Sequence, residues 1–329
     1  MKPPRLPSLI AGTLLTTALA IAAPIAWAQD AAPVRLLVGL AAGGSLDILA
    51  RELAVGMEKA LGRPVVVENR AGAGGQIAAQ TLKAARPDGN TLLVTNSHSL
   101  TMIPNVVRDP GYDVTRDFVP VALLATNPDA LAASTVTIGH TPKDLAAFAD
   151  WVRREPGRGN IGVPAPASAP DFTVSALSKA LDIDLRSVAY RGGAPVVQDL
   201  LAGQIAAGIA SVSVMQSQAA SGKLKLLAVN GTSRSPLSPD VPTFAELGIQ
   251  GMESQMFIAV MAPSGTPEQR LQALSEAIDT TMAQPRMRER LSSLGMTVEQ
   301  GNGEELAERI RRAATADAGM VSRAGFAPQ

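Results

Sequence analysis

The sequence predicts an α/β protein built from two successive strand–helix units. Short runs rich in Val, Ile and Leu alternate with segments whose apolar residues recur at helical spacing. Most of the strand-like runs lead into glycine-rich or polar loops, and a helical pattern then follows. This alternation is typical of sheets with parallel strands and helices on their faces.

The first unit begins with a buried strand at residues 34–40 and a small-residue loop at 41–44. The following helix starts near Ser45 and ends at Gly62, a usual helix-ending residue. The elements expected next are a strand at 64–68, a glycine loop at 69–75, a helix at 76–85 and a strand at 91–95. This order favours a mostly parallel sheet.

The second unit follows an apolar run at residues 119–125 and repeats the alternation. Its expected helices are 144–154, 171–181, 194–202 and 212–221, and its expected strands are 160–163, 185–190, 205–209 and 225–229. Residues 256–262 are again strand-like, and the chain is helical from Pro267 onward. The mixed charges at 304–312 are typical of a solvated helix face.

Residues 1–28 have the pattern of a cleaved secretory signal. Lys2 and Arg5 precede an apolar run, and Ala26 and Ala28 form an A-x-A cleavage pattern. We therefore expect a periplasmic protein that keeps no membrane anchor. The chain has no cysteine, which excludes a lipid anchor at the cleavage site, disulfides and thiolate metal sites.

Charge and composition exclude several classes of partner. Removing the signal leaves 27 basic against 29 acidic residues, a formal net charge of −2, so nucleic acid is not expected. Aromatic residues make up only 3% of the chain, which argues against an aromatic-cage site. No later stretch reaches the ~18 apolar residues of a membrane span, so we expect a protein that is not membrane-embedded.

No flexible linker separates the two units, so we expect lobes that share crossing strands. The crossings are expected near residues 125–127 and 254–257. Lobe 1 would then hold residues 29–126 and 253–329, and lobe 2 residues 127–252. A ligand would bind in the cleft at the carboxyl ends of the strands of both lobes.

The first candidate binding site is the start of the first helix, at Gly43, Gly44, Ser45, Leu46 and Asp47. Helix N-termini leave backbone N–H groups without partners, in the positive field of the helix dipole. These groups can bind an anion such as a carboxylate. The alternative is a plain strand–helix connection in which Asp47 is an ordinary first-turn acid.

A second candidate lies in residues 164–171, between a strand and a helix of the second unit. Its expected ligand-binding residues are Ala167, Ser168, Ala169 and Asp171, through the Ser168 hydroxyl and the N–H groups of the helix start. The alternative is a proline-stiffened surface loop.

Other motifs give weaker signals. The glycine loop at 69–75 departs from a dinucleotide fingerprint at Ile77, so no cofactor is expected. The two histidines, His98 and His140, belong to different lobes and indicate no metal site. Ser97 and His98 directly follow a strand and are expected in the cleft. A secreted serine hydrolase using Ser97 or Ser168 with His98 is an alternative, although no G-x-S-x-G motif occurs.

Seven stretches together resemble one family, the Bug family of periplasmic solute-binding proteins, which are TctC-like receptors of tripartite tricarboxylate transporters. They are VGLAAGGSLDILARELA (38–54), VVVENRAGAGGQIAA (65–79), RPDGNTLLVT (86–95), YDVTRDFVPVALLA (112–125), VAYRGGAPVVQDLLAGQ (188–204), LKLLAVNGTSRSPLSPDVPT (224–243) and MAPSGTP (261–267).

The resemblance implies a type II periplasmic binding fold, with two lobes of mixed sheets joined by crossing strands. It implies a non-enzymatic, monomeric receptor whose ligand is a small organic carboxylate. Backbone amides of residues 41–47 and 164–171 would hold the carboxylate, and residues 95–99 would line the cleft. The partner would be the membrane permease of such a transporter, or a sensor ectodomain if the receptor only signals.

The chain departs from the family pattern in both loops. The first loop lacks the family's prolines, and Leu46 is expected to make it more apolar. In the second loop only Ser168 keeps a hydroxyl, Pro170 removes an N–H donor, and Asp171 adds a negative charge. We therefore expect a monocarboxylate, or a ligand with an amine or amide facing Asp171, rather than a citrate-like ligand.

Overall fold

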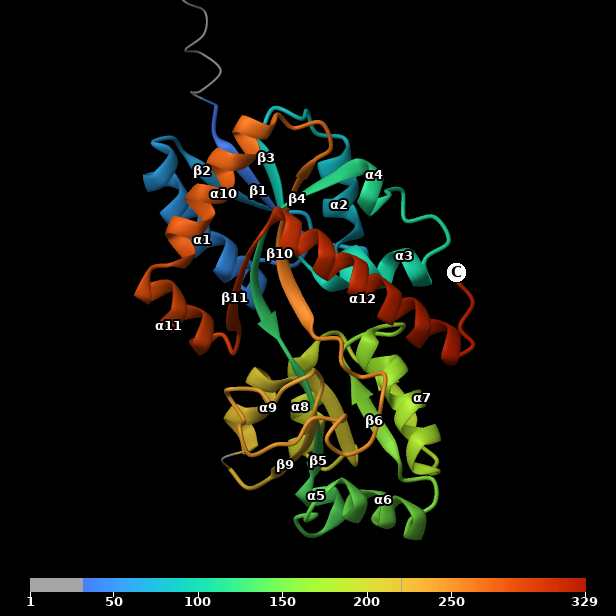
Figure 1. The fold of residues 1–329 in the computed structure, drawn as a ribbon. Coiled ribbons are helices and arrows are strands. Elements are labelled where there is room, and N and C mark those ends of the chain that lie inside the picture. The colour runs from blue at the N-terminus through green and yellow to red at the C-terminus, as the bar shows by residue number, and fades with distance from the viewer. Residues whose placement is uncertain (1–31, 220) are drawn as a thin grey trace, which may run out of the picture. The chain divides into compact units, whose positions relative to one another are not determined.

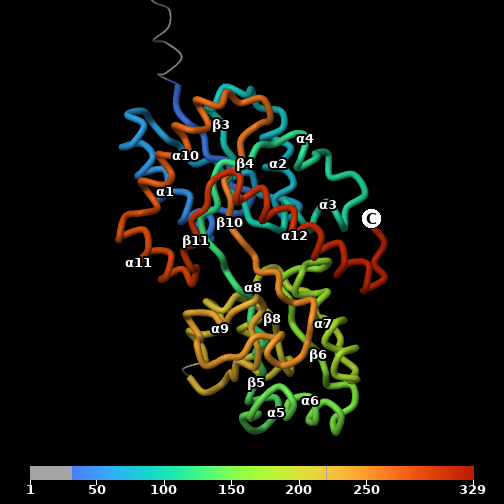
Figure 2. Tube along the Cα trace, in the orientation of Figure 1, coloured from blue at the N-terminus to red at the C-terminus, as the bar shows by residue number. Residues whose placement is uncertain are grey.

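The computed structural model describes residues 32–219 and 221–329, which form two mixed sheets with helices on their faces (Figures 1 and 2). The expected signal at residues 1–28 lies outside the described residues. In the part of the chain that is described, no helix is both long and apolar enough to span a bilayer. The expected α/β fold with two mixed sheets is confirmed.

The first sheet has six strands, drawn from both ends of the chain. Their order is β11 (Thr297–Asn302), β4 (Phe118–Asn127), β10 (Met256–Pro263), β3 (Thr91–Asn96), β1 (Val34–Val38) and β2 (Val65–Asn69). Only β1 pairs in parallel, with β2 and β3, whereas β10 and β11 pair antiparallel with their neighbours. The expectation of a mostly parallel sheet was therefore wrong beyond the first three strands, because β10 returns between β3 and β4.

The second sheet has five strands. Their order is β7 (Arg186–Ala189), β6 (Asn160–Val163), β8 (Ala207–Ser211), β5 (Asp129–Ser134) and β9 (Leu224–Val229). Here β6 pairs in parallel with β7 and β8, while β5 is antiparallel to β8 and β9. Pro128 alone separates β4 of the first sheet from β5 of the second.

The helices fall into two sets, one for each sheet. The first set is α1 (Ser45–Leu61), α2 (Gln76–Lys83), α3 (Ile103–Val106), α4 (Val114–Asp117), α10 (Glu268–Met282), α11 (Pro285–Ser293) and α12 (Gly303–Arg323), with short turns η2 (Ala73–Gly75) and η3 (His98–Met102). The second set is α5 (Thr135–Ile138), α6 (Leu145–Arg154), α7 (Ala169–Leu181), α8 (Gly193–Leu201) and α9 (Val212–Ala219).

The central strands are buried on both faces. In β1, Leu36 belongs to the core cluster under α1 and α10, whereas its neighbour Leu37 belongs to the cluster on the opposite face, with residues of α2 and α12. Successive strand residues point to opposite faces, so a run of apolar residues is what a doubly covered strand requires. Helix α1 ends as expected at Gly62, whose φ is +65° and whose N–H donates to Glu58 O at 3.0 Å.

Two strands were missed by the sequence analysis. The sequence of β5, DALAAS, holds no β-branched residue, yet its residues after Asp129 are buried between β8 and β9. The edge strand β11, TVEQGN, is largely polar. Both become strands because neighbouring strands pair with them, an effect that local propensity does not carry.

Candidate functional site

The candidate loops lie at the edges of the two sheets where the chain crosses between them. In the first sheet, β1 and β3 end at the same edge. Strand β4 also ends there, and its last residue, Asn127, pairs with Met256, the first residue of β10. In the second sheet, β6 and β8 end at the edge where Asp129, the start of β5, pairs with Ser211. The topology therefore places the loops after β1, β3 and β6 next to the crossing segments.

The first loop, residues 41–47, leads from β1 into α1. Gly43 has a φ of +84°, a conformation that favours glycine, and its N–H donates to Asp47 Oδ2 at 2.9 Å. The first bond within the helix runs from Ile48 N to Gly44 O at 3.0 Å. The N–H groups of Ser45, Leu46 and Asp47 precede that bond and have no acceptor inside the helix.

Asp47 holds the first loop in shape. Its carboxylate accepts from Arg51 Nε at 3.0 Å and from Asn69 Nδ2 at 2.9 Å, and the Arg51 bond is the main reason that the pKa of Asp47 falls to about 2. Asn69 Nδ2 also lies 3.1 Å from Leu40 O, which ties the first loop to the end of β2. Asn69 was not recognised as a site residue from the sequence, because its partners are distant in the chain.

The second loop, residues 164–171, repeats the geometry of the first. Ala167 has a φ of +51°, and its N–H donates to Asp171 Oδ2 at 2.8 Å. Ser168 is extended, and the first helical bond runs from Phe172 N to Ser168 O at 3.1 Å. The N–H groups of Ala169 and Asp171 are therefore available at the helix start, and Pro170 has none.

One expectation about a side chain needs correction. Leu46 is only 5% exposed and packs into the core under α1, so its side chain cannot make the loop surface more apolar. The first helical turn points this side chain inward. Asp171, expected to add a negative charge, accepts the Ala167 N–H with its carboxylate, as Asp47 accepts that of Gly43. Both acids shape their own loops.

Ser97 and His98 lie after β3, next to the glycine loop (residues 69–75). Ser97 Oγ accepts from Phe257 N at 3.4 Å, and a Cβ added at Gly74 would lie 3.0 Å from His98 Nε2. Burial lowers the pKa of His98 below its ordinary value. Ser168 Oγ donates to Ala165 O at 2.7 Å. In residues 32–219 and 221–329, neither serine hydrogen-bonds to a histidine.

The glycine loop serves close packing. A Cβ at Gly39 would lie 2.8 Å from Gly75 Cα, and Gly72 and Gly75 have φ values of +145° and +105°. The loop thus brings β1 and the segment after β3 together. The second loop joins the same region, since Ala167 packs against a cluster containing Met102. No hydrogen bond in the described residues joins the first loop to the second.

Arg191 is a cation beside the second loop and was not among the site residues expected from the sequence. Its neighbours Tyr190 and Gly192 donate their N–H groups to Val163 O and Pro164 O, both at 2.8 Å. The side chain is exposed and has no ion-pair partner among the described residues. The sequence feature that could have identified Arg191 is a single arginine in a glycine turn that follows a strand.

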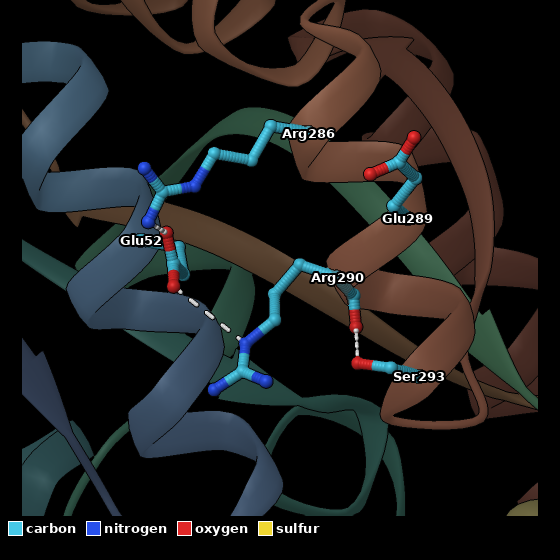
Figure 3. Close-up of a pocket in the computed structure, with 5 residues that line it drawn as sticks. All are labelled: Glu52, Arg286, Glu289, Arg290 and Ser293. Atoms are coloured by element: carbon cyan, nitrogen blue, oxygen red, sulfur yellow. Dashed lines mark hydrogen bonds and ion pairs between the residues drawn. The ribbon is translucent and has the colours of Figure 1, made fainter.

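A groove of about 490 Å³ between α1 and α11 is separate from these loops. Figure 3 shows Glu52 of α1 reaching two arginines of α11, Arg286 at 3.3 Å and Arg290 at 3.6 Å. These ion pairs lie two helical turns from the start of α1. Within the described residues, no group of three or more His, Cys, Asp or Glu side chains could hold a metal ion.

Comparisons with known proteins agree with this fold. Residues 49–325 match the family model described as the tripartite tricarboxylate transporter family receptor, TctC. Protein BugT of Bordetella pertussis is 32% identical over 298 residues, which covers 88% of each chain.

Solved structures show the same fold. The periplasmic binding protein BugD is 31% identical, with a TM-score of 0.76 over 90% of this chain and 99% of its own. MatC of Rhodopseudomonas palustris, solved with bound malate, is 30% identical, with a TM-score of 0.74 over 88% of this chain and 98% of its own. The chain belongs to the TctC family of tripartite tricarboxylate transporter receptors, which includes the Bug proteins.

Proposed function

We propose that this protein is a periplasmic receptor that captures a small carboxylate-bearing solute between its two lobes and delivers it for uptake. The observation that carries the proposal is the pair of matched loops. Each follows a parallel strand, each has a backbone N–H bonded to an aspartate four residues on, and each leaves N–H groups free at a helix start. Such groups bind anions.

The proposed binding residues are those at the two helix starts, Gly43–Asp47 and Ala167–Asp171, with Ser97 and His98 beside them. Arg191 adds a positive charge next to the second loop. MatC was solved with malate, a carboxylate, and this supports the ligand class. The second loop has few donors, because Pro170 has no N–H and the Ser168 hydroxyl is bonded to Ala165 O. A citrate-like ligand with several charges is therefore not the one we expect.

Ligand binding can be tested on the purified protein by mass spectrometry of co-purified solutes and by calorimetry with a panel of carboxylates. Arg191→Gln should weaken binding of the best carboxylate by about tenfold, the usual size of a charge-assisted contact. Arg186→Gln is the matched control. Arg186 lies at the opposite end of β7, where it pairs with Asp184 at 2.9 Å, and its loss should leave affinity unchanged. Failure of every carboxylate to bind, or citrate binding most tightly, would contradict the proposal.

Uptake is distinguishable from signalling alone. Deletion of the gene should abolish accumulation of the radiolabelled ligand in intact cells, and cell fractionation should place the protein in the periplasm. A receptor that only informs a sensor would leave uptake unchanged while altering gene expression in response to the ligand. Binding to its partner requires the two lobes to close on the ligand, a hinge motion at the crossing strands.

A further inference from the structure

The crossing segment Asn127-Pro128-Asp129 has a fully bonded backbone on the second-sheet side. Pro128 O accepts from Val212 N at 2.8 Å, and Asp129 N donates to Asn230 Oδ1 at 2.8 Å. Asp129 O accepts from Asn230 N at 3.0 Å. Asn230 is itself fixed, because its Nδ2 donates to Ser254 O at 2.6 Å on the returning chain. The segment is therefore held firmly where the two sheets meet.

The side chain of Asn127 has an unsatisfied acceptor. Asn127 is 6% exposed, and its Oδ1 is the one buried side-chain polar atom without a hydrogen-bond partner in the described part of the chain. Nearly all buried polar groups in proteins are bonded, so an exception points to a partner that is absent from the protein itself. The missing partner must be a hydrogen-bond donor.

Asp129 presents a second acceptor two residues away. No cation forms an ion pair with its carboxyl group within residues 32–219 and 221–329, although the residue keeps partial access to solvent. Burial raises the pKa of Asp129 to about 7. In an extended chain, residues two apart point to the same face, so Asn127 and Asp129 can present their oxygens together.

We infer that Asn127 and Asp129 form the acceptor end of the ligand site and bind an N–H donor, an ammonium or amide group, on a ligand whose carboxylate is held by the two loops. The inference rests on the proposed function. The helix starts and Arg191 supply donors and positive charge, whereas the crossing segment presents the unpaired Asn127 Oδ1 and the carboxyl group of Asp129. A ligand that matches both has a carboxylate at one end and N–H groups at the other. A dicarboxylate would place a second negative charge against Asp129.

The test uses three ligands of equal chain length: succinate, γ-aminobutyrate and succinamate. Calorimetry of the purified full-length mature protein at neutral pH should show the amino acid or the amide binding about tenfold or more tightly than succinate. A preference for γ-aminobutyrate would identify the donor as an ammonium group, and a preference for succinamate would identify it as an amide. A preference for succinate would overturn the inference.

Variants separate this inference from the proposed function. Asp129→Asn should reduce the preference for γ-aminobutyrate over succinate by about tenfold, and Asn127→Ala should weaken both N–H ligands without improving succinate. Asp150→Asn removes an acid on α6 that pairs with Arg153, and it should change nothing. Circular dichroism checks that each variant folds. An unchanged preference in a folded Asp129→Asn protein that still binds carboxylates would overturn the inference alone. Loss of all carboxylate binding in the unmodified protein would overturn both.

Discussion

Thr101 Oγ1 lies 2.6 Å from Asp317 Oδ2, and this buried contact ties the segment after β3 to α12. The same hydroxyl is 2.9 Å from Ser97 O. A hydroxyl carries one proton and cannot donate to both oxygens. If Thr101 donates to Ser97, the carboxyl group of Asp317 must supply the other proton. Asp317 is protonated when Thr101 donates to Ser97 O, and ionised when Thr101 donates to Asp317 Oδ2.

Asp317→Asn should stabilise the protein above neutral pH. Burial raises the pKa of Asp317 from 3.8 to about 6, so the folded state holds this proton more tightly than the unfolded state. The stabilisation from that proton is complete below the ordinary pKa and is lost as the pH rises through about 6. An amide needs no proton, so the variant should gain up to about 3 kcal/mol over the unmodified protein at about pH 8 and little at about pH 4.

Urea unfolding at a series of pH values measures this difference. The exposed Asp150→Asn variant is a control that should track the unmodified protein at every pH. A constant difference between Asp317→Asn and the unmodified protein from about pH 4 to about pH 8 would show that Asp317 does not titrate as described.

Gly295→Ala should destabilise the contact between the turn before β11 and α9. A Cβ at Gly295 would lie 1.6 Å from the Cβ of Ser213, and Gly295 has a φ of +71°. Gly222→Ala is the matched control, because Gly222 has a φ of +73° and no atom within 4 Å of an added Cβ. We expect the free energy of unfolding to fall by about 1–2 kcal/mol in both variants because of the positive φ. In Gly295→Ala it should fall by a further ~1–3 kcal/mol because of the clash.

Denaturant unfolding measures the loss of unfolding free energy in each of the two variants. Ser213→Gly combined with Gly295→Ala should restore only part of the steric loss, because Ser213 Cα would still lie 2.6 Å from the added Cβ, and it should leave the part due to φ. Equal losses in the two single variants would contradict a close contact at Gly295.

Ala167→Gly should stabilise the second loop by about 0.5–1 kcal/mol. Ala167 has a φ of +51°, where a Cβ is unfavourable, and the matching position of the first loop is already glycine, Gly43. Ala165→Gly, in the same loop but outside the positive-φ region, should instead be neutral or destabilising. Thermal unfolding of the two variants side by side checks the prediction, and a lower Tm for Ala167→Gly would contradict it.

Asp47→Ala should weaken carboxylate binding by about tenfold, although its carboxylate is turned toward its own loop. The change frees the N–H of Gly43 and the amide of Asn69, so the helix start loses its fixed shape. Glu52→Ala is the control on the same helix. It removes the ion pairs with Arg286 and Arg290 in the groove of Figure 3, two helical turns from the helix start, and calorimetry should find its affinity unchanged.

Much of this protein could be predicted from its sequence, for local reasons. The apolar run of β1, the glycine that ends α1 at Gly62 and the small-residue loop at Gly43 and Gly44 are signals carried by neighbouring residues. The periodic segments gave the order of helices and strands, and the motifs along the whole chain gave the family. These features need no knowledge of distant contacts.

Tertiary structure decided what each polar side chain does. The sequence is the same whether the Asp171 carboxylate is free or bonded to the Ala167 N–H. Only the loop conformation makes Asp171 the counterpart of Asp47. The strand β5 forms because β8 and β9 flank it, and Asn127 and Asp129 lie at the crossing because β4 continues into another sheet. Pairing and burial depend on residues far apart in the chain, which local patterns cannot specify.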